Sequence, residues 1–495
     1  MQQSSSHQGS RRQETESKVQ GVTGMDAMPV IQKGYENMNR TGRLFASLAA
    51  VILTASLASC DNKPQTGKTD NLDTATREEL ASIAAKDSRL TGELENKTIK
   101  WMANWGFSAE KDPNLVVFQE RYGGNIEETI IDWSVRYDKL ATAINGDEGI
   151  DFFPAGDTDA FPKGAIKSMF VPVDDYIDFS SELWADVKTA NDIFLWDGHH
   201  YVICTDVSGA NTAIIYNKKT IEEYGLEDPA ELFEKGEWNW DTFKKQLDDF
   251  VDPENGLYGI DGWWTEAALS LTTGVPYIGL KDGKLVNNLK DPAIERVQKF
   301  MAELHDDGCV LDKGLFDWSE KPNFIGEGKE LFYPCGLWAV YKPAEEWKKT
   351  FGEDAFFVPM PKDPKADYYY IPSTVEGFMM VSGGKNPEGV AKFAECKRVV
   401  LLNEGLRKVG EDMTVESYGW TPEMVAMRDK MTEMANEHPV FDFYVGVSND
   451  VTSILDSAET GIRGSLQGGT PWSETVNSCY DVIDALIDDA NNGRS

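Results

Sequence analysis

The chain has 495 residues, with 83 acidic and 48 basic side chains and a net charge of −35. Such an acidic surface repels nucleic acid and anionic lipid headgroups, which argues against a nucleic-acid-binding protein. Hydrophobic residues make up 41% of the chain and aromatic residues 11%, too many for an acidic disordered chain. The length exceeds what a single hydrophobic core usually holds, so we expect two lobes.

The first feature along the chain is an apolar run over 44–59, preceded by two arginines. It is shorter than the roughly 20 residues of a transmembrane helix, and its basic start and small-residue end are typical of a secretory signal peptide. The run ends in Leu57-Ala58-Ser59-Cys60, which resembles the bacterial lipoprotein signal, where the peptide is cut before a cysteine that then carries lipid. We therefore predict a signal peptide over 38–59 and lipidation (palmitate) of Cys60. The alternative is an ordinary cysteine buried in a core helix.

The segments on either side of this signal are polar. Residues 1–37 contain few hydrophobic side chains and are predicted to form a disordered extension. Because a signal peptide normally begins a chain, Met38 is the expected start of the protein. Residues 60–97 are predicted to be a polar tether that contains one helix, over 76–87.

Strands and helices then alternate. The composition predicts strands over 97–106, 128–133, 149–156 and 212–217, and helices over 136–147 and 218–225. Three longer helices should begin at a capping residue followed by proline, in Asp291-Pro292, Asn386-Pro387 and Thr470-Pro471. This alternation predicts an α/β protein whose mainly parallel sheets are flanked by helices, with ligands bound in loops beyond the strand ends.

Sequence patterns for common catalytic and cofactor sites are missing. We find no dinucleotide or phosphate loop, zinc-protease motif, nucleophile elbow or EF-hand. His199 and His200 are expected at a turn into a strand and not at a metal. We therefore predict no cofactor, no metal and no catalytic residue. A glycosidase pair of carboxylates cannot be recognised by counting, so a secreted glycoside hydrolase remains an alternative.

Five cysteines follow Cys60 at wide spacing, an odd number without any CxxC pair. This pattern fits neither a disulfide framework nor a zinc site. We expect most of them to be small core residues. They are Cys204, Cys309, Cys335, Cys396 and Cys479.

Several of the 14 tryptophans lie beside Gly, Asn or Asp and outside apolar periods. A flat aromatic ring matches the apolar face of a sugar, while carboxylates and amides bind its hydroxyl groups. Tryptophans in loops therefore favour a carbohydrate cleft, although each could instead pack in a lobe core. The examples are Trp105, Trp263, Trp264 and Trp338.

Four segments of the chain, in this order, carry a resemblance to a known family. They are YVICTDVSGANTAIIYNKKTIEEYGLEDP, GEWNWDTFKKQLDDF, FIGEGKELFYPCGLWAVYK and FFVPMPKDPKADYYYIPSTVEGFMMVSGGKNPEGVAKFAECKRV. Together with the lipoprotein signal they resemble extracellular solute-binding proteins of bacterial ABC importers, of the sugar-binding type that includes maltose-binding protein.

The resemblance implies a type II periplasmic-binding-protein-like fold, with two lobes joined by a hinge. The first lobe is expected over 98–205 and 376–445, and the second over 206–375 and 446–490. Residues 205–211 and 376–384 are expected to cross between the lobes.

The resemblance also implies a function. A monomeric, non-enzymatic protein would be lipid-anchored at the extracytoplasmic face of the cell membrane. It would capture a sugar or oligosaccharide and deliver it to an ABC permease. The same fold could instead bind a peptide, a polyamine or another small solute.

The expected ligand-binding residues follow from their positions in the family pattern. Trp338 matches a ring that stacks on sugar, and Glu376 stands where many members have glycine, which puts the identity of the sugar in doubt. The full set is Asn104, Trp105, Asp157, Asp206, Asn211, Trp263, Trp264, Trp338, Glu376 and Gly377.

Overall fold

The computed structural model describes residues 71–156, 158–261 and 264–493. The predicted signal peptide and Cys60 lie outside the described residues. Within the described part, no helix is both long enough and apolar enough to cross a membrane.

The first sheet has five strands in the order β2-β1-β3-β13-β6. Strand β1 runs parallel to β2 and β3, whereas β13 is antiparallel to β3 and β6. The strands span Thr98–Ala103 (β1), Asn125–Ile130 (β2), Phe152–Pro154 (β3), Ile203–Ser208 (β6) and Thr374–Met380 (β13).

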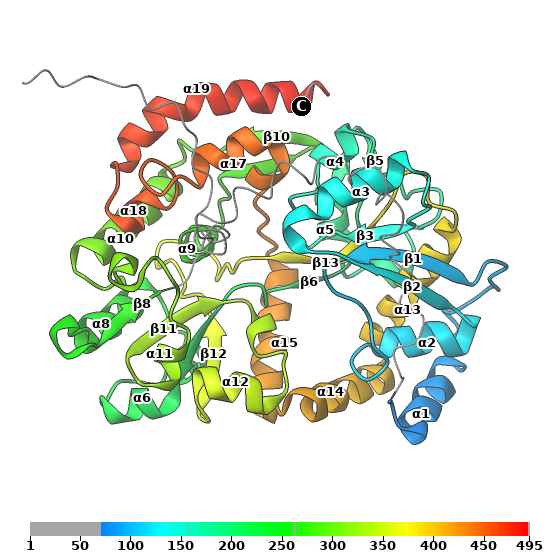
Figure 1. Ribbon diagram of the computed structural model, residues 1–495, viewed down its shortest axis with the longest axis horizontal. Coiled ribbons are helices and arrows are strands. Elements are labelled where there is room, and N and C mark those ends of the chain that lie inside the picture. Colours follow the sequence, from blue (N-terminus) through cyan, green and yellow to red (C-terminus); the bar gives the residue numbers. More distant parts are fainter. Residues whose placement is uncertain (1–70, 157, 262–263, 494–495) are drawn as a thin grey trace, which may run out of the picture. The chain divides into compact units, whose positions relative to one another are not determined.

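Helices cover both faces of this sheet, with α2 and α13 on one side and α3 and α5 on the other (Figure 1). The strand alternation explains this arrangement, because successive side chains point to opposite faces. Phe152 packs in the core with Phe118 of α2 and Phe393 of α13, whereas Phe153 packs in the core that contains Leu140 of α3. The helices span Pro113–Tyr122 (α2), Arg136–Asn145 (α3), Lys188–Ile193 (α5) and Pro387–Leu402 (α13).

The second sheet has four strands in the order β12-β7-β11-β8. Strand β7 is antiparallel to β11 and β12, and β8 is parallel to β11. The strands span Ala213–Asn217 (β7), Tyr258–Ile260 (β8), Glu330–Cys335 (β11) and Ala355–Pro359 (β12).

The α/β class and the two lobes are therefore confirmed, but the expectation of mainly parallel sheets is wrong. Antiparallel pairs surround β13 in the first sheet and β7 in the second. Each of these strands follows a crossing. Strand β7 is the first strand after the chain leaves the first sheet, and β13 is the first strand after it returns. A returning strand can pair antiparallel without a crossover helix, which a parallel pair would need.

Two short hairpins complete the strands, β4 (Leu195–Trp196) with β5 (His199–His200) and β9 (Ile278–Lys281) with β10 (Lys284–Asn287). The turn predicted before the histidine pair is confirmed. Asp197 and Gly198 form it, both with positive φ, as the tight turns of two-residue hairpins require.

The remaining helices complete the two lobes. In the first half of the chain they are α1 (Thr74–Ala84), α4 (Lys163–Ile166), α6 (Lys218–Glu223), α7 (Pro229–Glu234) and α8 (Trp240–Phe250). In the middle they are α9 (Thr265–Leu271), α10 (Pro292–Asp306), α11 (Asn323–Gly326) and α12 (Ala344–Phe351). Towards the end they are α14 (Glu404–Tyr418), α15 (Pro422–Glu437), α16 (Tyr444–Val447), α17 (Asn449–Leu455), α18 (Gly464–Gln467) and α19 (Trp472–Asn491).

Two of the three predicted helix caps are confirmed. The Asp291 side chain accepts from the backbone N–H of Ala293, and the Asn386 side chain accepts from Gly389. The third prediction is wrong, because α19 begins at Trp472 and its start has no side-chain cap. The N–H of Thr470 instead donates to the carbonyl of Glu459, which holds Thr470 in the preceding turn.

The first crossing between the sheets lies close to its predicted place. Strand β6 ends at Ser208 in the first sheet, and β7 begins at Ala213 in the second, so residues 209–212 connect them. The crossing predicted over 376–384 is wrong, because hydrogen bonds hold its first half in β13. The chain crosses earlier, over 360–373, between β12 and β13.

A third connection follows α15, which contacts both β6 and β12 and stands between the two sheets (Figure 1). Residues 438–443 leave this helix, and Asp442 accepts from the backbone N–H groups of Tyr277 and Ile278. At Gly209 the connections meet, since an added Cβ would lie 2.4 Å from Ile371 and 2.8 Å from the carbonyl oxygen of Met431. Only glycine fits such a close approach.

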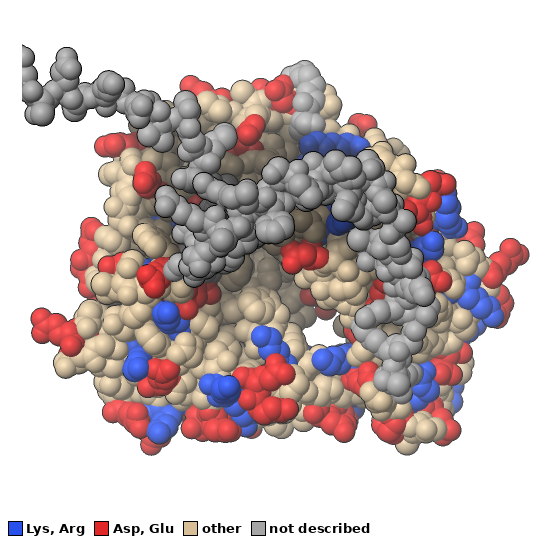
Figure 2. Space-filling view, in the orientation of Figure 1, with Lys and Arg blue, Asp and Glu red and all other residues tan. Residues whose placement is uncertain are grey.

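The face of the molecule seen in Figure 2 carries Asp and Glu side chains together with Lys and Arg, with acidic groups prominent along its lower edge. Many basic groups pair with a carboxylate one helical turn away, as in Lys244–Asp248 of α8. The five cysteines after Cys60 are buried and free, as predicted from their spacing.

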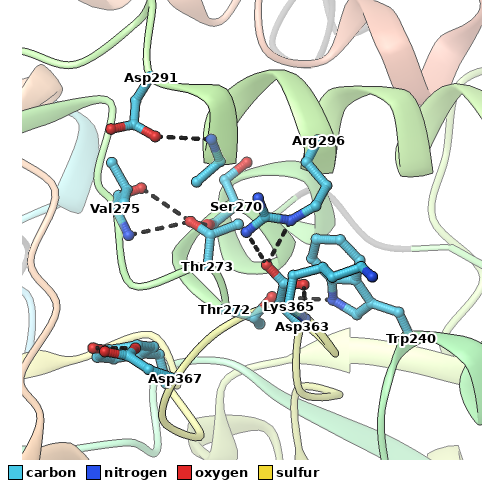
Figure 3. A network of polar contacts seen from close by, with 12 residues as sticks. Trp240, Ser270, Thr272, Thr273, Val275, Asp291, Arg296, Asp363, Lys365 and Asp367 are labelled. Atoms are coloured by element: carbon cyan, nitrogen blue, oxygen red, sulfur yellow. Dashed lines mark hydrogen bonds and ion pairs between the residues drawn. The ribbon is translucent and has the colours of Figure 1, made fainter.

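A buried ion pair fixes the second crossing to the second lobe (Figure 3). Arg296 of α10 donates through Nε and Nη2 to one oxygen of Asp363, whose side chain is fully buried. The other Asp363 oxygen accepts from the N–H of Lys365. The segment 360–373 is thus anchored at its start by charge and hydrogen bonds.

Candidate functional site

A pocket of about 320 Å³ is lined by residues of the first sheet, of the first crossing and of the segment that follows β11 of the second sheet. Its walls come from the ends of β1 and β3, the first half of β13, the start of α3, the middle of α13, the link after β6 and the segment after β11. The carboxyl ends of strands in an α/β sheet are the usual place for a ligand.

On the side of the first sheet, the pocket contains a buried network around Asp159. This carboxylate pairs with the guanidinium of Arg136 and accepts from the hydroxyl of Tyr137. Arg136 also donates to the carbonyl of Trp133 at 2.7 Å. Burial, with Asp159 alongside, raises the pKa of Tyr137 well above its usual value, so this phenol stays protonated and can donate.

A second charged pair lies on β13 and α13. Lys397 Nζ lies 3.2 Å from a carboxylate oxygen of Glu376, whose side chain is about half exposed. The strand register shifts between Glu376 and Gly377, and a Cβ on Gly377 would lie 2.2 Å from the carbonyl oxygen of Ile203. The bulge and the missing side chain together direct Glu376 toward the pocket.

Trp105 forms the aromatic part of this wall. It follows β1, and its carbonyl accepts from the indole N–H of the buried Trp101 at 2.8 Å. Its ring packs edge-on against Trp101 at 4.9 Å and Phe107 at 5.0 Å, yet 43% of the residue is exposed. The indole is therefore held in place while one surface remains open to a ligand.

The second lobe contributes Trp338, in a single helical turn over Leu337–Ala339 that follows β11. Half of Trp338 is exposed. Its indole nitrogen would lie 2.2 Å from a Cβ on Gly336, so the ring rests over a glycine. The N–H of Leu337 donates to the carbonyl of Ala210 at 2.8 Å, which joins this turn to the first crossing. Trp264 packs edge-on against Trp338, with ring centroids 6.3 Å apart.

Tyr341 closes the pocket behind Trp338. Burial raises the pKa of its hydroxyl, which therefore remains protonated. Its ring stacks on Trp420 at 4.7 Å, which fixes its orientation. Within the described residues, no group of three His, Cys, Asp or Glu side chains is arranged to hold a metal ion.

Comparisons with known proteins match this architecture to a family. Residues 116–413 match the family model of bacterial extracellular solute-binding proteins. The chain belongs to this family. A comparison with curated proteins finds no match.

Solved structures of ABC transporter proteins share the fold of this solute-binding protein. An ABC substrate-binding protein from Listeria monocytogenes in complex with cycloalternan is 16% identical, with a TM-score of 0.58, covering 79% of this chain and 100% of its own. The GacH receptor of Streptomyces glaucescens, solved unliganded and with acarbose, is 15% identical, with a TM-score of 0.56, covering 79% and 98%. A solute-binding protein from Thermotoga lettingae bound with α-D-tagatose is 16% identical, with a TM-score of 0.54, covering 79% and 100%. At these identities the likeness establishes the fold.

Six of the ten residues predicted as ligand-binding lie together in the pocket of this solute-binding protein. They are Asn104, Trp105, Asn211, Trp338, Glu376 and Gly377. Trp264 is outside the lining but touches Trp338.

The other three predicted residues are placed differently. Asp206 lies in β6, and its side chain accepts from Asn436 at 3.0 Å, away from the pocket lining. Burial raises the pKa of Asp206. Asp157 and Trp263 lie outside the described residues.

Sequence reasoning missed several lining residues, notably Arg136, Tyr137, Asp159, Tyr341 and Lys397. Asp159 could have been found, since it lies in the loop after β3, at a strand end. Arg136 and Tyr137 begin a helix that was predicted correctly, but nothing in the helix pattern marks them as facing a pocket. Lys397 sits within α13, and only the sheet register reveals its partner, Glu376.

Proposed function

We propose that this solute-binding protein captures a sugar or oligosaccharide in the pocket and delivers it to the permease of an ABC transporter. The observation that carries the proposal is the placement of two half-exposed indoles, Trp105 and Trp338, beside two charged pairs in one pocket. Indole rings stack on the apolar faces of sugars, while carboxylates, guanidinium and ammonium groups bind hydroxyls. Proteins of similar fold, solved with cycloalternan, acarbose and tagatose, support the same ligand class.

Capture works through closure of the lobes. We assign them as predicted to 98–205 with 376–445 and to 206–375 with 446–490, except that β6 and β13 extend the first lobe to 208 and from 374. A ligand that touches Trp105 and Trp338 together binds the closed arrangement more strongly, and this difference in affinity shifts the population toward it. The connections over 209–212, 360–373 and 438–443 are the places where the backbone can bend. No covalent bond of the ligand changes, so the protein acts as a monomeric carrier and not as an enzyme.

The protein reaches its permease through a lipid anchor on Cys60, at the extracytoplasmic face of the cell membrane. Acyl chains hold a protein at a bilayer without a membrane-spanning helix. Expression of wild type and Cys60→Ser in a bacterial host, followed by membrane fractionation, tests this. We expect the wild type in the membrane pellet and the variant in the supernatant. Retention of the variant by membranes would disprove the anchor.

A thermal-shift screen of the purified full chain tests the ligand class. A ligand that binds only the folded state raises the melting temperature as its occupancy rises. Mono- and oligosaccharides form the test set, with short peptides and polyamines as controls. We expect a shift with one glycan class and none with the controls. A shift with a peptide or polyamine alone would keep the fold and overturn the sugar.

A further inference from the structure

Two exposed indoles lie next to the pocket but outside its lining, one on each lobe. Trp133, in the single turn over Trp133–Val135 before α3, is 55% exposed. Trp264, at the start of α9, is 51% exposed. Large rings in water cost free energy, and a monomeric protein keeps such groups exposed in clusters mainly where something binds.

Each of these indoles is attached to a residue of the pocket wall. The Trp133 ring lies 3.9 Å from the Arg136 guanidinium, on which it stacks, and Arg136 is held in turn by Asp159. The Trp264 ring meets Trp338 edge-on. Both outer rings are therefore oriented by groups that line the pocket, one on each lobe, and extend the aromatic surface beyond the lining.

Trp133 does not stand alone on the first lobe. Ile130 and Val135, on either side of it in the chain, are also exposed, at 46% and 38%. The end of β2 and the turn after it thus present an apolar ledge of three side chains beside Arg136. The pocket itself, at about 320 Å³, is near the lower end of the range for small-molecule sites. A ligand confined to it would leave the ledge and Trp264 uncovered.

The charges in the described lining are balanced. Arg136 pairs with Asp159, and Lys397 pairs with Glu376, so each cation has its own carboxylate. A charged ligand would have to break one of these pairs, whereas a neutral one can hydrogen-bond to both members. The electrostatics of the pocket therefore favour an uncharged ligand.

We infer that the ligand is a neutral oligosaccharide of at least three sugar units, whose middle occupies the pocket and whose ends stack on Trp133 and Trp264. This inference rests on the proposed function and deepens it, since it selects among sugars by length and charge. Each end of the chain places one apolar sugar face on an outer indole, and the inner units use Trp105 and Trp338.

Calorimetry with ligand series of rising length tests the inference on the purified full chain. The probes are α-1,4-glucans, β-1,4-glucans and β-1,4-mannans of one to five units, with oligogalacturonates as acidic counterparts. We expect one neutral series to bind, with affinity rising at least tenfold from the disaccharide to the tetrasaccharide. Trp133→Ala and Trp264→Ala should each remove most of that rise, and each should weaken tetrasaccharide binding far more than disaccharide binding. Trp318→Ala, which removes another exposed indole outside the pocket lining, is the matched control and should change neither.

The outcomes separate this inference from the proposed function. Equal affinity for a monosaccharide and a tetrasaccharide, or binding of the acidic series alone, overturns the inference and keeps sugar capture. Loss of disaccharide binding in the Trp133 or Trp264 variant places that ring inside the pocket and also overturns it. Absence of binding to any sugar defeats the proposed function itself. Melting temperatures verify folding, and Trp133→Phe and Trp264→Phe, which retain a ring, should keep part of the length dependence.

Discussion

The two walls of the pocket are built from different chemistry. The first-lobe wall carries charge, in the Arg136–Asp159 and Lys397–Glu376 pairs, and a single lining indole, Trp105. The second-lobe wall carries Trp338 and Tyr341, with Trp264 behind, and no charged group among its described lining residues. Under the proposed function, a ligand would receive hydrogen bonds from one lobe and ring contacts from the other.

The carboxylates of the two lobes also differ in how they are compensated. Near the first-lobe wall, Asp159 and Glu376 each have a cation as partner. In the second lobe, Glu330 is buried, and among the described residues neither of its carboxylate oxygens has a hydrogen-bond partner. Glu266 is equally buried, with one oxygen facing Gln467 and Arg463 and the other without a partner. Of these four carboxylates, the two near the first-lobe wall are paired with cations, whereas burial raises the pKa of the two second-lobe glutamates.

The largest effect should come from breaking the buried pair of the first wall. Asp159→Asn removes the carboxylate that pairs with the Arg136 guanidinium, which is 5% exposed. Removal of one partner of a buried pair typically costs about 3 kcal/mol or more. We expect a matching loss in the free energy of unfolding by urea, together with weaker ligand binding.

The matched control is Asp192→Asn, which breaks the pair between Asp192 and Lys188 at the surface, where both side chains are at least half exposed. Exposed pairs contribute about 1 kcal/mol or less. If the two variants lose equal stability, Asp159 is not the centre of a buried network.

The next effect separates the second wall from the first. Trp338→Ala removes the ring that the second lobe offers, and the loss of buried apolar contact should weaken ligand binding by about 1–3 kcal/mol. Because the ring is half exposed, the melting temperature without ligand should hardly change. Calorimetry with the sugar found in the screen measures the first quantity, and differential scanning calorimetry the second.

Gly336→Ala sharpens this prediction, since it keeps the indole but displaces it. The new Cβ would lie 2.2 Å from the ring nitrogen of Trp338 and 2.9 Å from the carbonyl oxygen of Asn211. We expect weaker binding than in the wild type and stronger binding than in Trp338→Ala. Unchanged affinity in both variants would remove Trp338 from the site.

The contrast between the walls also shows what a sequence can reveal. Trp105 could be picked out because its neighbours, Asn104 and Gly106, conflict with a core pattern, and Trp338 because it follows Gly336 in a segment that resembles the family. The charged pairs could not, because Arg136 with Asp159 and Glu376 with Lys397 are each separated by about two dozen positions in the chain. Their pairing depends on the strand order β3-β13-β6 and on a bulge in β13, neither of which leaves a local signature.

The fold shows the same division. Periodicity and capping identified α3, α10 and α13 within one or two residues. Pairing direction was missed, because a strand such as β13 reads the same whether its neighbour is parallel or antiparallel. The second crossing was placed too late for a related reason. The residues after Glu376 are a glycine and three apolar side chains, which suits a link, but the hydrogen bonds of β13 to β3 and β6 make them part of a central strand.

The third prediction concerns pH and the buried carboxylates of the second lobe. Burial raises the pKa of Glu266 to about 7 from its usual 4.5 and raises that of Glu330 well above it. Between pH 4.5 and 7, Glu266 and Glu330 hold protons in the folded chain that they have already released in the unfolded chain. The contribution of these two groups to the free energy of unfolding therefore falls as pH rises from 4.5 through 7, because the folded state binds more protons than the unfolded state in this range.

Glu266→Gln and Glu330→Gln should each flatten this dependence, since glutamine is neutral at every pH. We expect the variants to melt a few degrees higher than the wild type at pH 8 and close to it at pH 5. Glu254→Gln, at an exposed position, serves as the control and should follow the wild type at both pH values. Parallel curves for all three variants and the wild type would show that the two buried carboxylates are ionised in the folded state.

The smallest effect is expected at the exposed pair of the first wall. Glu376 is about half exposed, so Glu376→Gln should lower stability by less than about 1 kcal/mol. Its effect on binding depends on how the wall contacts a ligand. If Glu376 accepts from a sugar hydroxyl, an amide oxygen can accept in its place, and affinity should fall only a few-fold; Glu376→Ala, which removes the acceptor, should reduce it further. Lys397→Met, measured in parallel, frees Glu376 from its partner. Affinities equal to that of the wild type in all three variants would mean that Glu376 and Lys397 take no part in recognising the ligand.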